Sequence, residues 1–267
     1  MSDWRPKLIA SDMDGTLLRR DDTVSEATLA ELERWRADGV PVVLATGRPP
    51  RWMTRIREVL GSGTAVCCNG AVLLDLERLE ILDEIALQPD RLRVITDELH
   101  AAHADMWFAV EYGFEFRHEP HYRPRWDVDV PGVAPATLEE MVQAPVAKLL
   151  VRSETMPRDE FVELVSRVVG DDATVTNSSA EALAEISAPG VTKATGLAHV
   201  AATHGVEPAD IVYFGDMPND IAAFEWVREA GGRAVAMAHA HPDAIAAATD
   251  VTLTNEEDGL VAFLRGL

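Results

Sequence analysis

Three times along the chain, a short apolar run is followed at once by a polar cluster that contains glycine. Residues 7–11 (KLIAS) precede 12–16 (DMDGT), residues 41–45 (PVVLA) precede 46–48 (TGR), and residues 211–214 (IVYF) precede 215–220 (GDMPND). Apolar runs of this length that end in turn-forming residues are typical of strands buried on both faces of a sheet. A helical pattern follows the first run, beginning at Ser25 and ending at Gly39, and another covers residues 49–60. The alternation predicts an α/β fold with a doubly wound, parallel, Rossmann-like sheet.

The pattern changes after residue 82 and returns near residue 188. The segment between them has an aromatic-rich strand pattern at 106–117, a proline-rich stretch at 120–135, strand patterns at 147–152, 173–176 and 183–187, and a helix pattern at 158–169. We therefore expect an α+β domain of residues 83–187, inserted between the third strand (64–68) and the fourth strand of a core made of residues 1–82 and 188–267. The end of the core has helix patterns at 220–230 and 242–248 and strand patterns at 233–236 and 251–253.

Composition excludes several classes of partner. The 267 residues carry a formal net charge of -21 at pH 7, and such a surface repels nucleic acid, whose binding depends on Lys and Arg. No apolar run approaches the roughly 20 residues of a membrane helix, and residues 1–9 lack the apolar stretch of a signal peptide. The only cysteines, Cys67 and Cys68, are adjacent, which suits neither a disulfide nor a zinc site. We expect a cytoplasmic protein with no nucleic-acid or membrane partner.

The polar clusters hold the parts of a phosphoryl-transfer site. In an open α/β sheet, ligands bind at the carboxyl ends of the strands, so the clusters containing Asp12, Thr46 and Asp216 can meet in one crevice. Carboxylates this close cannot all ionise without a cation, and oxygen ligands without His or Cys favour Mg²⁺. Mg²⁺ and Lys193 would neutralise a phosphoryl group while a carboxylate attacks it and forms an aspartyl-phosphate.

The same clusters resemble the four signatures of the haloacid dehalogenase superfamily of phosphatases. Residues 12–17 (DMDGTL) resemble the first signature, Thr46 the second, Lys193 the third and 215–220 the fourth, in the family's order. The TGR run, residues 69–71 (NGA), the tail from 236 to 259 and the place of the insertion are similar to the Cof-type, sugar-phosphatase-like branch, whose members carry a large α/β cap there. The resemblance covers roughly residues 7–68 and 190–267, and it covers the insertion by size and position only.

The resemblance implies a role for each matched residue. Asp12 would be the nucleophile and a Mg²⁺ ligand, and Asp14 would be the general acid and base with its backbone carbonyl on the metal. Asp216 would be the third metal contact, and Asp220 would orient Lys193 or a metal-bound water. The implied activity is Mg²⁺-dependent hydrolysis of a small phosphorylated metabolite by a monomer or a homodimer. The residues implied to bind the phosphoryl group or the substrate are Thr46, Gly47, Arg48, Lys193 and Asn219.

Each motif also has an ordinary structural explanation. An Asp-x-Asp pair is common in turns, an isolated lysine is usually solvated, and residues 216–220 could form a helix N-terminus. His239 and His241 have a metal-like spacing, but no further His or Cys lies near them in sequence, so we favour positions on the surface or beside the metal site. One aromatic set is expected to form the core of the inserted domain rather than a substrate platform. This set is Trp107, Phe108, Tyr112, Phe114 and Phe116.

The chain departs from the family's pattern at two places, and three other functions are compatible with parts of the sequence. Met217 stands where some relatives have glycine, and residues 237–240 (MAHA) replace Met-Gly-Asn-Ala. The alternatives are a phosphotransferase or mutase on the same scaffold, a receiver that accepts phosphate without turnover, and a catalytically silent binding protein. Receivers are shorter and lack an insertion, and intact Asp12 and Asp14 argue against a silent relative. Sugar phosphates, flavin mononucleotide and pyridoxal phosphate all remain open as substrates.

Overall fold

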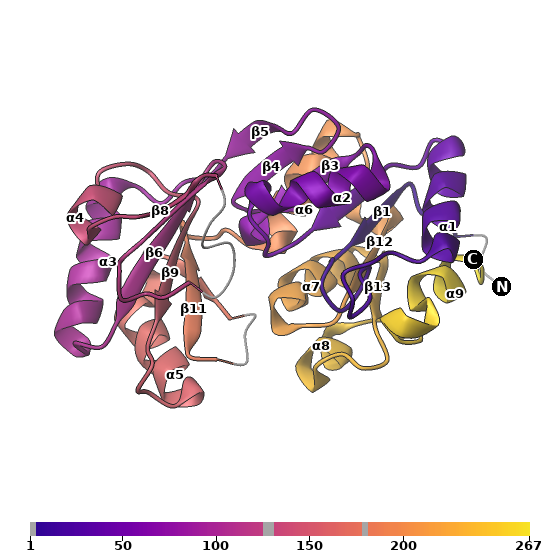
Figure 1. Cartoon of the computed structure of the whole chain (residues 1–267). Coiled ribbons are helices and arrows are strands. Elements are labelled where there is room, and N and C mark those ends of the chain that lie inside the picture. The colour runs from indigo at the N-terminus through magenta and orange to yellow at the C-terminus, as the bar shows by residue number, and fades with distance from the viewer. Residues whose placement is uncertain (1–3, 125–130, 178–180) are drawn as a thin grey trace. The chain divides into compact units, whose positions relative to one another are not determined.

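The computed structural model describes residues 4–124, 131–177 and 181–267. Part of the proline-rich stretch at 120–135 lies outside these residues. The chain forms two compact units (Figure 1). Unit 1 comprises Met1–Arg48, Trp52–Leu82 and Thr192–Leu267, and unit 2 comprises Pro49–Arg51 and Asp83–Val191.

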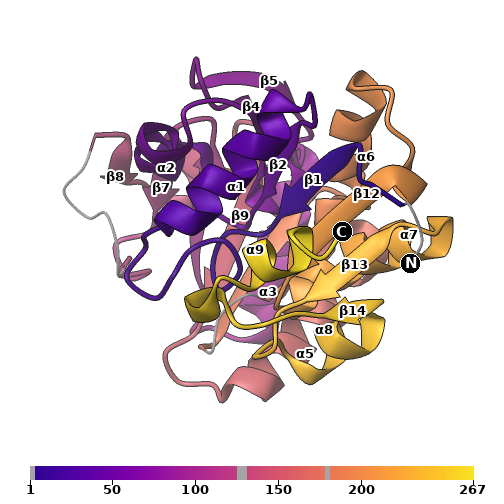
Figure 2. The ribbon, with the colours of Figure 1, turned by 90° about the vertical axis from the view of Figure 1, so that its right-hand side faces the viewer.

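Unit 1 is built on a sheet with the strand order β14-β13-β12-β1-β2-β3-β4-β5. The strands from β14 to β3 pair in parallel, as expected from the alternation of strands and helices, and Figure 2 shows β1, β12 and β13 side by side. The antiparallel strand β4 and its neighbour β5 were not expected, and they precede the insertion. The strands are β1 (Leu8–Ser11), β2 (Val42–Ala45), β3 (Thr64–Cys67), β4 (Val72–Asp75), β5 (Glu80–Glu84), β12 (Ile211–Gly215), β13 (Arg233–Ala236) and β14 (Asp250–Val251).

Local sequence signals explain where the helices of unit 1 begin and end. Ser25 caps α1 by accepting a hydrogen bond from the backbone N–H of Thr28, and Thr192 caps α6 in a capping box. Gly231 ends α7 with a φ of 94°. The helices are α1 (Glu26–Ala37), α2 (Met53–Leu60), α6 (Lys193–Thr203), α7 (Ile221–Ala230), α8 (Pro242–Ala247) and α9 (Gly259–Leu264), with short 3₁₀ turns at η2 (Cys68–Gly70), η4 (Pro208–Asp210), η5 (Pro218–Asp220) and η6 (Asn255–Glu257). A further 3₁₀ turn, η1 (Pro50–Trp52), has its first two residues in unit 2 and its last in unit 1.

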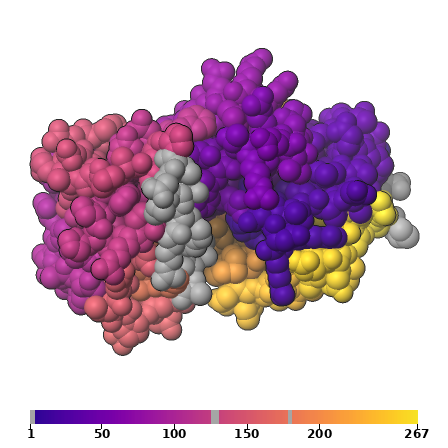
Figure 3. Space-filling model, in the orientation of Figure 1, coloured from indigo at the N-terminus to yellow at the C-terminus, as the bar shows by residue number. Residues whose placement is uncertain are grey.

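The core of unit 1 fixes the strand ends that carry the polar clusters. Four fully buried side chains from neighbouring elements pack together here. They are Leu8 of β1, Tyr213 of β12, Leu197 of α6 and Phe224 of α7. Each such large apolar side chain contributes about 1.5–3 kcal/mol of burial free energy. Helix α2 and the turn between β4 and β5 lie on the outer surface of unit 1, on the face that Figure 3 shows.

Among the described residues, no helix is both long and apolar enough to cross a membrane.

Unit 2 has its own sheet and its own core. The strand order is β10-β11-β9-β6-β7-β8, antiparallel except between β7 and β8. Helices α3 and α5 pack on this sheet through a cluster that includes Leu99, Phe108 and Phe161. The elements are β6 (Trp107–Tyr112), β7 (Glu115–His118), β8 (Val133–Pro135), β9 (Lys148–Arg152), β10 (Thr174–Thr176), β11 (Leu183–Ser187), α3 (Pro89–Ala102), α4 (Leu138–Met141), α5 (Arg158–Val169) and η3 (Gly170–Asp172).

Three local expectations need correction. The single strand pattern at 106–117 is a hairpin, β6 and β7, because Gly113 takes a positive φ of 55° between them. Phe114 lies in that turn and is 37% exposed, so it is not part of the core, whereas Phe108 and Phe116 are buried as expected. The strand expected at 251–253 is the shorter edge strand β14 (Asp250–Val251), and both Val251 and Leu253, which follows the strand, are exposed.

Candidate active site

The first cluster begins where β1 ends. The backbone N–H of Asp12 still bonds to the carbonyl of Phe214, 2.8 Å away, so the sheet itself holds Asp12 beside the end of β12. Gly15 then turns the chain with a φ of 78°, and a Cβ there would lie 2.4 Å from Asp216 Oδ2. Only glycine fits at this position, because it combines a positive φ with the close approach of a carboxylate.

Lys193 joins two of the clusters by its ammonium group. Its Nζ lies 2.6 Å from Asp12 Oδ1 and 2.7 Å from Asp220 Oδ1, and its side chain is 1% exposed. Burial alone would lower the pKa of Lys193, but attraction to Asp12 and Asp220 outweighs it and raises the pKa. Lys193 therefore stays charged, and it links residues that lie 181 and 27 positions away in the chain.

Asp220 is saturated with protein donors. Its Oδ1 accepts from Lys193 and from the hydroxyl of Tyr213 at 2.6 Å, while its Oδ2 accepts from the backbone N–H groups of Asp216 and Met217, each at 2.9 Å. The side chain of Asp220 is 0% exposed. This geometry fits the supporting role expected for Asp220, and Tyr213 is a partner that sequence reasoning missed.

Asp12, Asp216 and Asp220 form a group whose carboxylate oxygens lie within 4.8 Å of one another. Burial, with repulsion from Asp220, raises the pKa of Asp216 to about 7, and burial raises the pKa of Asp12 although Lys193 opposes the change. One ammonium against three buried carboxylates leaves an excess of negative charge. An all-oxygen donor set with that excess fits a hard divalent cation such as Mg²⁺. Asp12 and Asp216 are the better ligands, because the oxygens of Asp220 already accept four hydrogen bonds.

The side chain of Asp14 pairs with Arg48. Arg48 Nε donates to Asp14 Oδ2 at 2.8 Å, its Nη2 donates to Asp14 Oδ1, and Nη2 also lies 2.8 Å from Asp22 Oδ1. Burial would lower the pKa of Arg48, but its bonds to Asp14 outweigh this and raise it. The side chain of Asp14 is 56% exposed. The sequence suggested Arg48 as a substrate contact; the structure adds its ion pair with Asp14, which no local pattern indicated.

The other matched residues lie around the same group. Thr46 is 0% exposed, and its Oγ1 accepts the backbone N–H of Arg48 at 3.0 Å, which leaves the hydroxyl proton available to a ligand. Asn219 lies in η5 beside Asp220, and its Nδ2 donates to Asn69 Oδ1 at 3.1 Å. Thr16, which sequence reasoning also missed as a contact, donates to Asp216 Oδ1 at 3.2 Å.

The two histidines differ in their surroundings. His241 caps α8 by accepting the backbone N–H of Asp243, and its own backbone N–H donates to the carbonyl of Asp216 at 2.8 Å. His239 Nε2 lies 3.9 Å from Asp216 Oδ2 with its side chain 36% exposed. Both imidazoles are partly exposed, and His239 is the one whose ring lies near the carboxylate of Asp216.

Comparisons with known proteins agree with this arrangement. The haloacid dehalogenase-like hydrolase family matches residues 9–264. The chain is 28% identical over 270 residues to the 5-amino-6-(5-phospho-D-ribitylamino)uracil phosphatase YitU of Bacillus subtilis, covering 98% of this chain and 97% of that protein. It is 25% identical over 272 residues to the pyridoxal phosphate phosphatase YbhA of Escherichia coli, covering 97% of each.

Solved structures show the same fold. A haloacid dehalogenase-like hydrolase from B. subtilis matches with a TM-score of 0.82 and 25% identity, over 98% of this chain and 99% of that one. A second such hydrolase, from Bacteroides thetaiotaomicron, has a TM-score of 0.77 at 23% identity, over 99% of both chains, which supports the fold alone. The resemblance seen in the four sequence signatures is confirmed. The chain belongs to the haloacid dehalogenase-like hydrolase family, and it is a phosphatase of the family's Cof-type branch.

Proposed function

We propose that the protein is a Mg²⁺-dependent phosphomonoester hydrolase that acts on a small phosphorylated metabolite through an aspartyl-phosphate on Asp12. The observation that carries the proposal is the contact of Lys193 with both Asp12 and Asp220 at the carboxyl ends of parallel strands. Asp12 Oδ1 is held by the ammonium, and among the described residues Asp12 Oδ2 accepts no hydrogen bond. That second oxygen is therefore the one available for attack on phosphorus.

The reaction would proceed in two displacements. The carboxylate of Asp12 attacks phosphorus, the ester P–O bond breaks, and Asp14 as a carboxylic acid gives its proton to the departing oxygen. Asp14, now a carboxylate, takes a proton from water as the water oxygen attacks phosphorus. The bond between phosphorus and Asp12 breaks, so inorganic phosphate leaves and both aspartates return to their first state.

The remaining residues would bind rather than react. Thr46, Lys193 and Asn219 would donate to phosphoryl oxygens, with the backbone at Gly47 lining the same pocket. Mg²⁺, when bound by Asp12, Asp216 and the backbone carbonyl of Asp14, would neutralise charge on the phosphoryl group. Arg48 would contact the substrate after leaving Asp14, which frees the Asp14 carboxyl for proton transfer.

The groups in unit 1 recognise only features that all phosphomonoesters share. We therefore propose that residues 83–187 act as a cap that selects the leaving group. The substrates named for the relatives, 5-amino-6-(5-phospho-D-ribitylamino)uracil and pyridoxal phosphate, are the first compounds to test, followed by sugar phosphates. We also propose a cytoplasmic location, with no nucleic-acid partner because of the net charge of -21.

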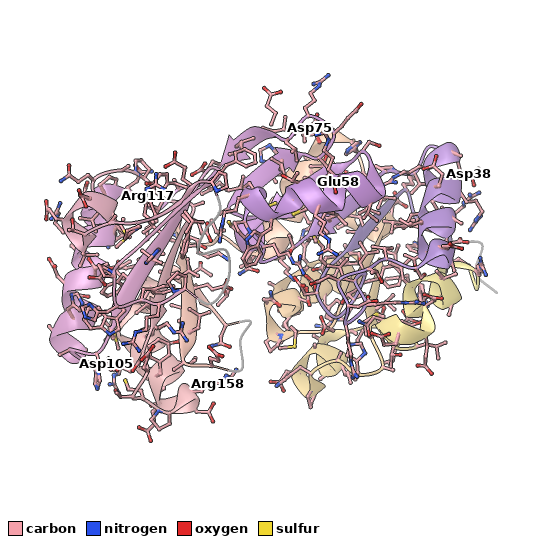
Figure 4. The ribbon with its side chains drawn as sticks, in the orientation of Figure 1. Asp38, Glu58, Asp75, Asp105, Arg117 and Arg158 are labelled. Atoms are coloured by element: carbon pink, nitrogen blue, oxygen red, sulfur yellow. The ribbon has the colours of Figure 1, made fainter. Side chains whose placement is uncertain are left out.

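The test is a panel of phosphomonoesters assayed with Mg²⁺ for wild type and Asp12→Asn. We expect free phosphate from at least one compound, and a loss of more than about 95% of that rate in the variant, because an amide cannot replace the nucleophile. Asp38→Asn, which changes an exposed carboxylate of unit 1 (Figure 4), is the matched control and keeps full activity. A rearranged sugar phosphate without free phosphate would indicate a mutase. A single stoichiometric phosphorylation without turnover would indicate a receiver.

A further inference from the structure

Asn69 lies in a turn with an unusual backbone. Cys68, Asn69 and Gly70 have φ values of 51°, 55° and 113°, so two successive residues with side chains occupy the left-handed region. Asn69 is 1% exposed. Residues with a Cβ rarely adopt this conformation, and among them asparagine tolerates it best. A strained and buried turn of this kind persists only where the surrounding structure fixes it.

The turn contacts the phosphate-binding loop after β2. The backbone N–H of Asn69 donates to the carbonyl of Thr46 at 2.9 Å, and that of Cys68 donates to the carbonyl of Arg48 at 3.0 Å. A Cβ at Gly47 would lie 3.2 Å from Asn69 Oδ1, so the glycine leaves room for the amide. The turn thus determines the position of the loop that carries the hydroxyl of Thr46.

The same turn contacts the start of the helix that carries Lys193. A Cβ at Gly70 would lie 2.0 Å from the carbonyl oxygen of Thr192, the residue just before Lys193. A Cβ at Gly196, one turn into α6, would lie 2.9 Å from the Cα of Gly70. The backbones of the turn and of α6 therefore pack directly on each other without intervening side chains.

The side chain of Asn69 reaches the third phosphate-binding element. Its Oδ1 accepts the Nδ2 hydrogen bond of Asn219 at 3.1 Å, across 150 residues of sequence. The Oδ1 of Asn219 is buried and has no hydrogen-bond partner within the described part of the chain. The hydrogen bond to Asn69 therefore fixes which way round the Asn219 amide lies, with its NH₂ group on the side of Asn69 and its oxygen on the other. If that amide rotated by 180°, it would present an oxygen where an anion needs a donor.

We infer that Asn69 is a positioning residue for the phosphate pocket, and that it acts through the amide of Asn219. This inference rests on the proposed function, in which Asn219 donates to a phosphoryl oxygen. The left-handed backbone places the Asn69 carboxamide between Gly47 and Asn219, and the carboxamide then holds Asn219 with its donor edge toward the ligand.

The backbone role and the amide role of Asn69 can be separated by two substitutions. Asn69→Gly keeps the positive φ without strain and removes the amide, whereas Asn69→Ala removes the amide and adds strain. We expect both variants to bind inorganic phosphate and orthovanadate about three- to tenfold more weakly than wild type in the presence of Mg²⁺, as the loss of one neutral hydrogen bond predicts. Both variants are expected to lower the melting temperature, because each leaves the Nδ2 of Asn219 without its buried acceptor, and Asn69→Ala is expected to lower it further through the added backbone strain. Leu79→Gly, at another left-handed residue of unit 1, is the matched control and keeps wild-type phosphate affinity.

A double-mutant cycle tests the path through Asn219. In an Asn219→Ala background, Asn69→Gly is expected to change phosphate affinity by less than about 1.5-fold, because the group it positions is already absent. Wild-type affinity in Asn69→Gly, or an undiminished loss in the Asn219→Ala background, would overturn the inference while leaving the proposed function intact. A wild-type protein that binds neither anion and hydrolyses no phosphomonoester would overturn both.

Discussion

Removing the hydroxyl of Tyr213 tests how much the buried carboxylate of Asp220 depends on its hydrogen-bond donors for stability. Tyr213 lies in β12 with 0% exposure, and its hydroxyl donates to Asp220 Oδ1 at 2.6 Å. Burial and the nearby carboxylate of Asp220 raise the pKa of Tyr213 well above its usual value, so the phenol is neutral and remains a donor. Tyr213→Phe removes this donor and leaves the ring, which packs against Phe224, in place.

The expected cost follows from what Asp220 keeps. A hydrogen bond to a charged group contributes about 1.5–3 kcal/mol to stability. Asp220 retains Lys193 and the two backbone donors, so it is weakened rather than left unpaired, and the void left by one oxygen adds only a few tenths of a kcal/mol. We therefore expect Tyr213→Phe to lower the free energy of unfolding of unit 1 by about 2–3 kcal/mol.

The assay is urea denaturation followed by tryptophan fluorescence and circular dichroism. Tyr122→Phe is the matched control, because Tyr122 is 5% exposed in unit 2 and its hydroxyl makes no hydrogen bond to any described residue. That change is expected to cost less than about 0.5 kcal/mol. Equal losses in the two variants, or a loss below about 0.5 kcal/mol in Tyr213→Phe, would refute the idea that Asp220 depends on its donors.

Four further outcomes are expected. Mg²⁺ at about 100 times its dissociation constant should raise the free energy of unfolding of EDTA-treated protein by about 2.7 kcal/mol, measured by thermal melts. Asp216→Asn should lose most of this stabilisation, and an equal stabilisation of the variant would contradict the assignment of Asp216 as a metal ligand. Lys148→Met should cost about 3–5 kcal/mol in urea, because it leaves Glu185 buried without the ammonium 2.7 Å away, and Lys148→Met with Glu185→Leu should recover most of the loss. Burial raises the pKa of Glu111 from 4.5 to about 7, so the folded state binds the proton more tightly than the unfolded state. The free energy of unfolding of unit 2 should therefore fall by up to about 3 kcal/mol as pH rises through this range. Glu111→Gln should make that free energy nearly independent of pH when denaturation is repeated across the same range. Exchange of residues 83–187 with those of a relative of different preference should transfer substrate preference, and a folded chimera that keeps the original preference counts against selection by the cap.

Local sequence predicted those elements whose signals are contained in a few residues. Helix α5 (Arg158–Val169) and strands β11 (Leu183–Ser187) and β13 (Arg233–Ala236) have the expected bounds, and proline or glycine stands close to at least one end of each of them. Helix α3 (Pro89–Ala102) was missed although Pro89 stands at its first turn and Leu92, Ile95 and Leu99 have helical spacing. Strand β14 is shorter than expected because it pairs on one side only, with β13.

The structure brings together Asp12, Lys193 and Asp220, but their roles as site residues stay predictions. Asp12 and Asp220 were expected near each other because parallel strands bring their carboxyl ends to one edge, whereas Lys193 was placed only by its order among the four signatures. The bonds from Tyr213 to Asp220 and from Asn219 to Asn69 depend on side-chain directions that no sequence pattern encodes. Asn69 gave a local signal, a turn before glycine, but that signal is shared by many turns without any role in binding.

The three buried carboxylates Asp12, Asp216 and Asp220 differ in how many hydrogen bonds they accept from the protein. Asp220 accepts four bonds from protein donors, so its charge is already compensated and its geometry is fixed. Asp12 accepts from Lys193, and Asp216 accepts from the hydroxyl of Thr16, which leaves both carboxylates with unused acceptor capacity. A cation gains more from two such unsaturated carboxylates than from one that must first give up its donors. Lys193 lies between Asp12 and Asp220, so Asp220 with its four hydrogen bonds anchors the ammonium, and the ammonium holds Asp12 through one oxygen. In the proposed reaction, this contact would fix the direction of the Asp12 carboxylate while its second oxygen attacks phosphorus.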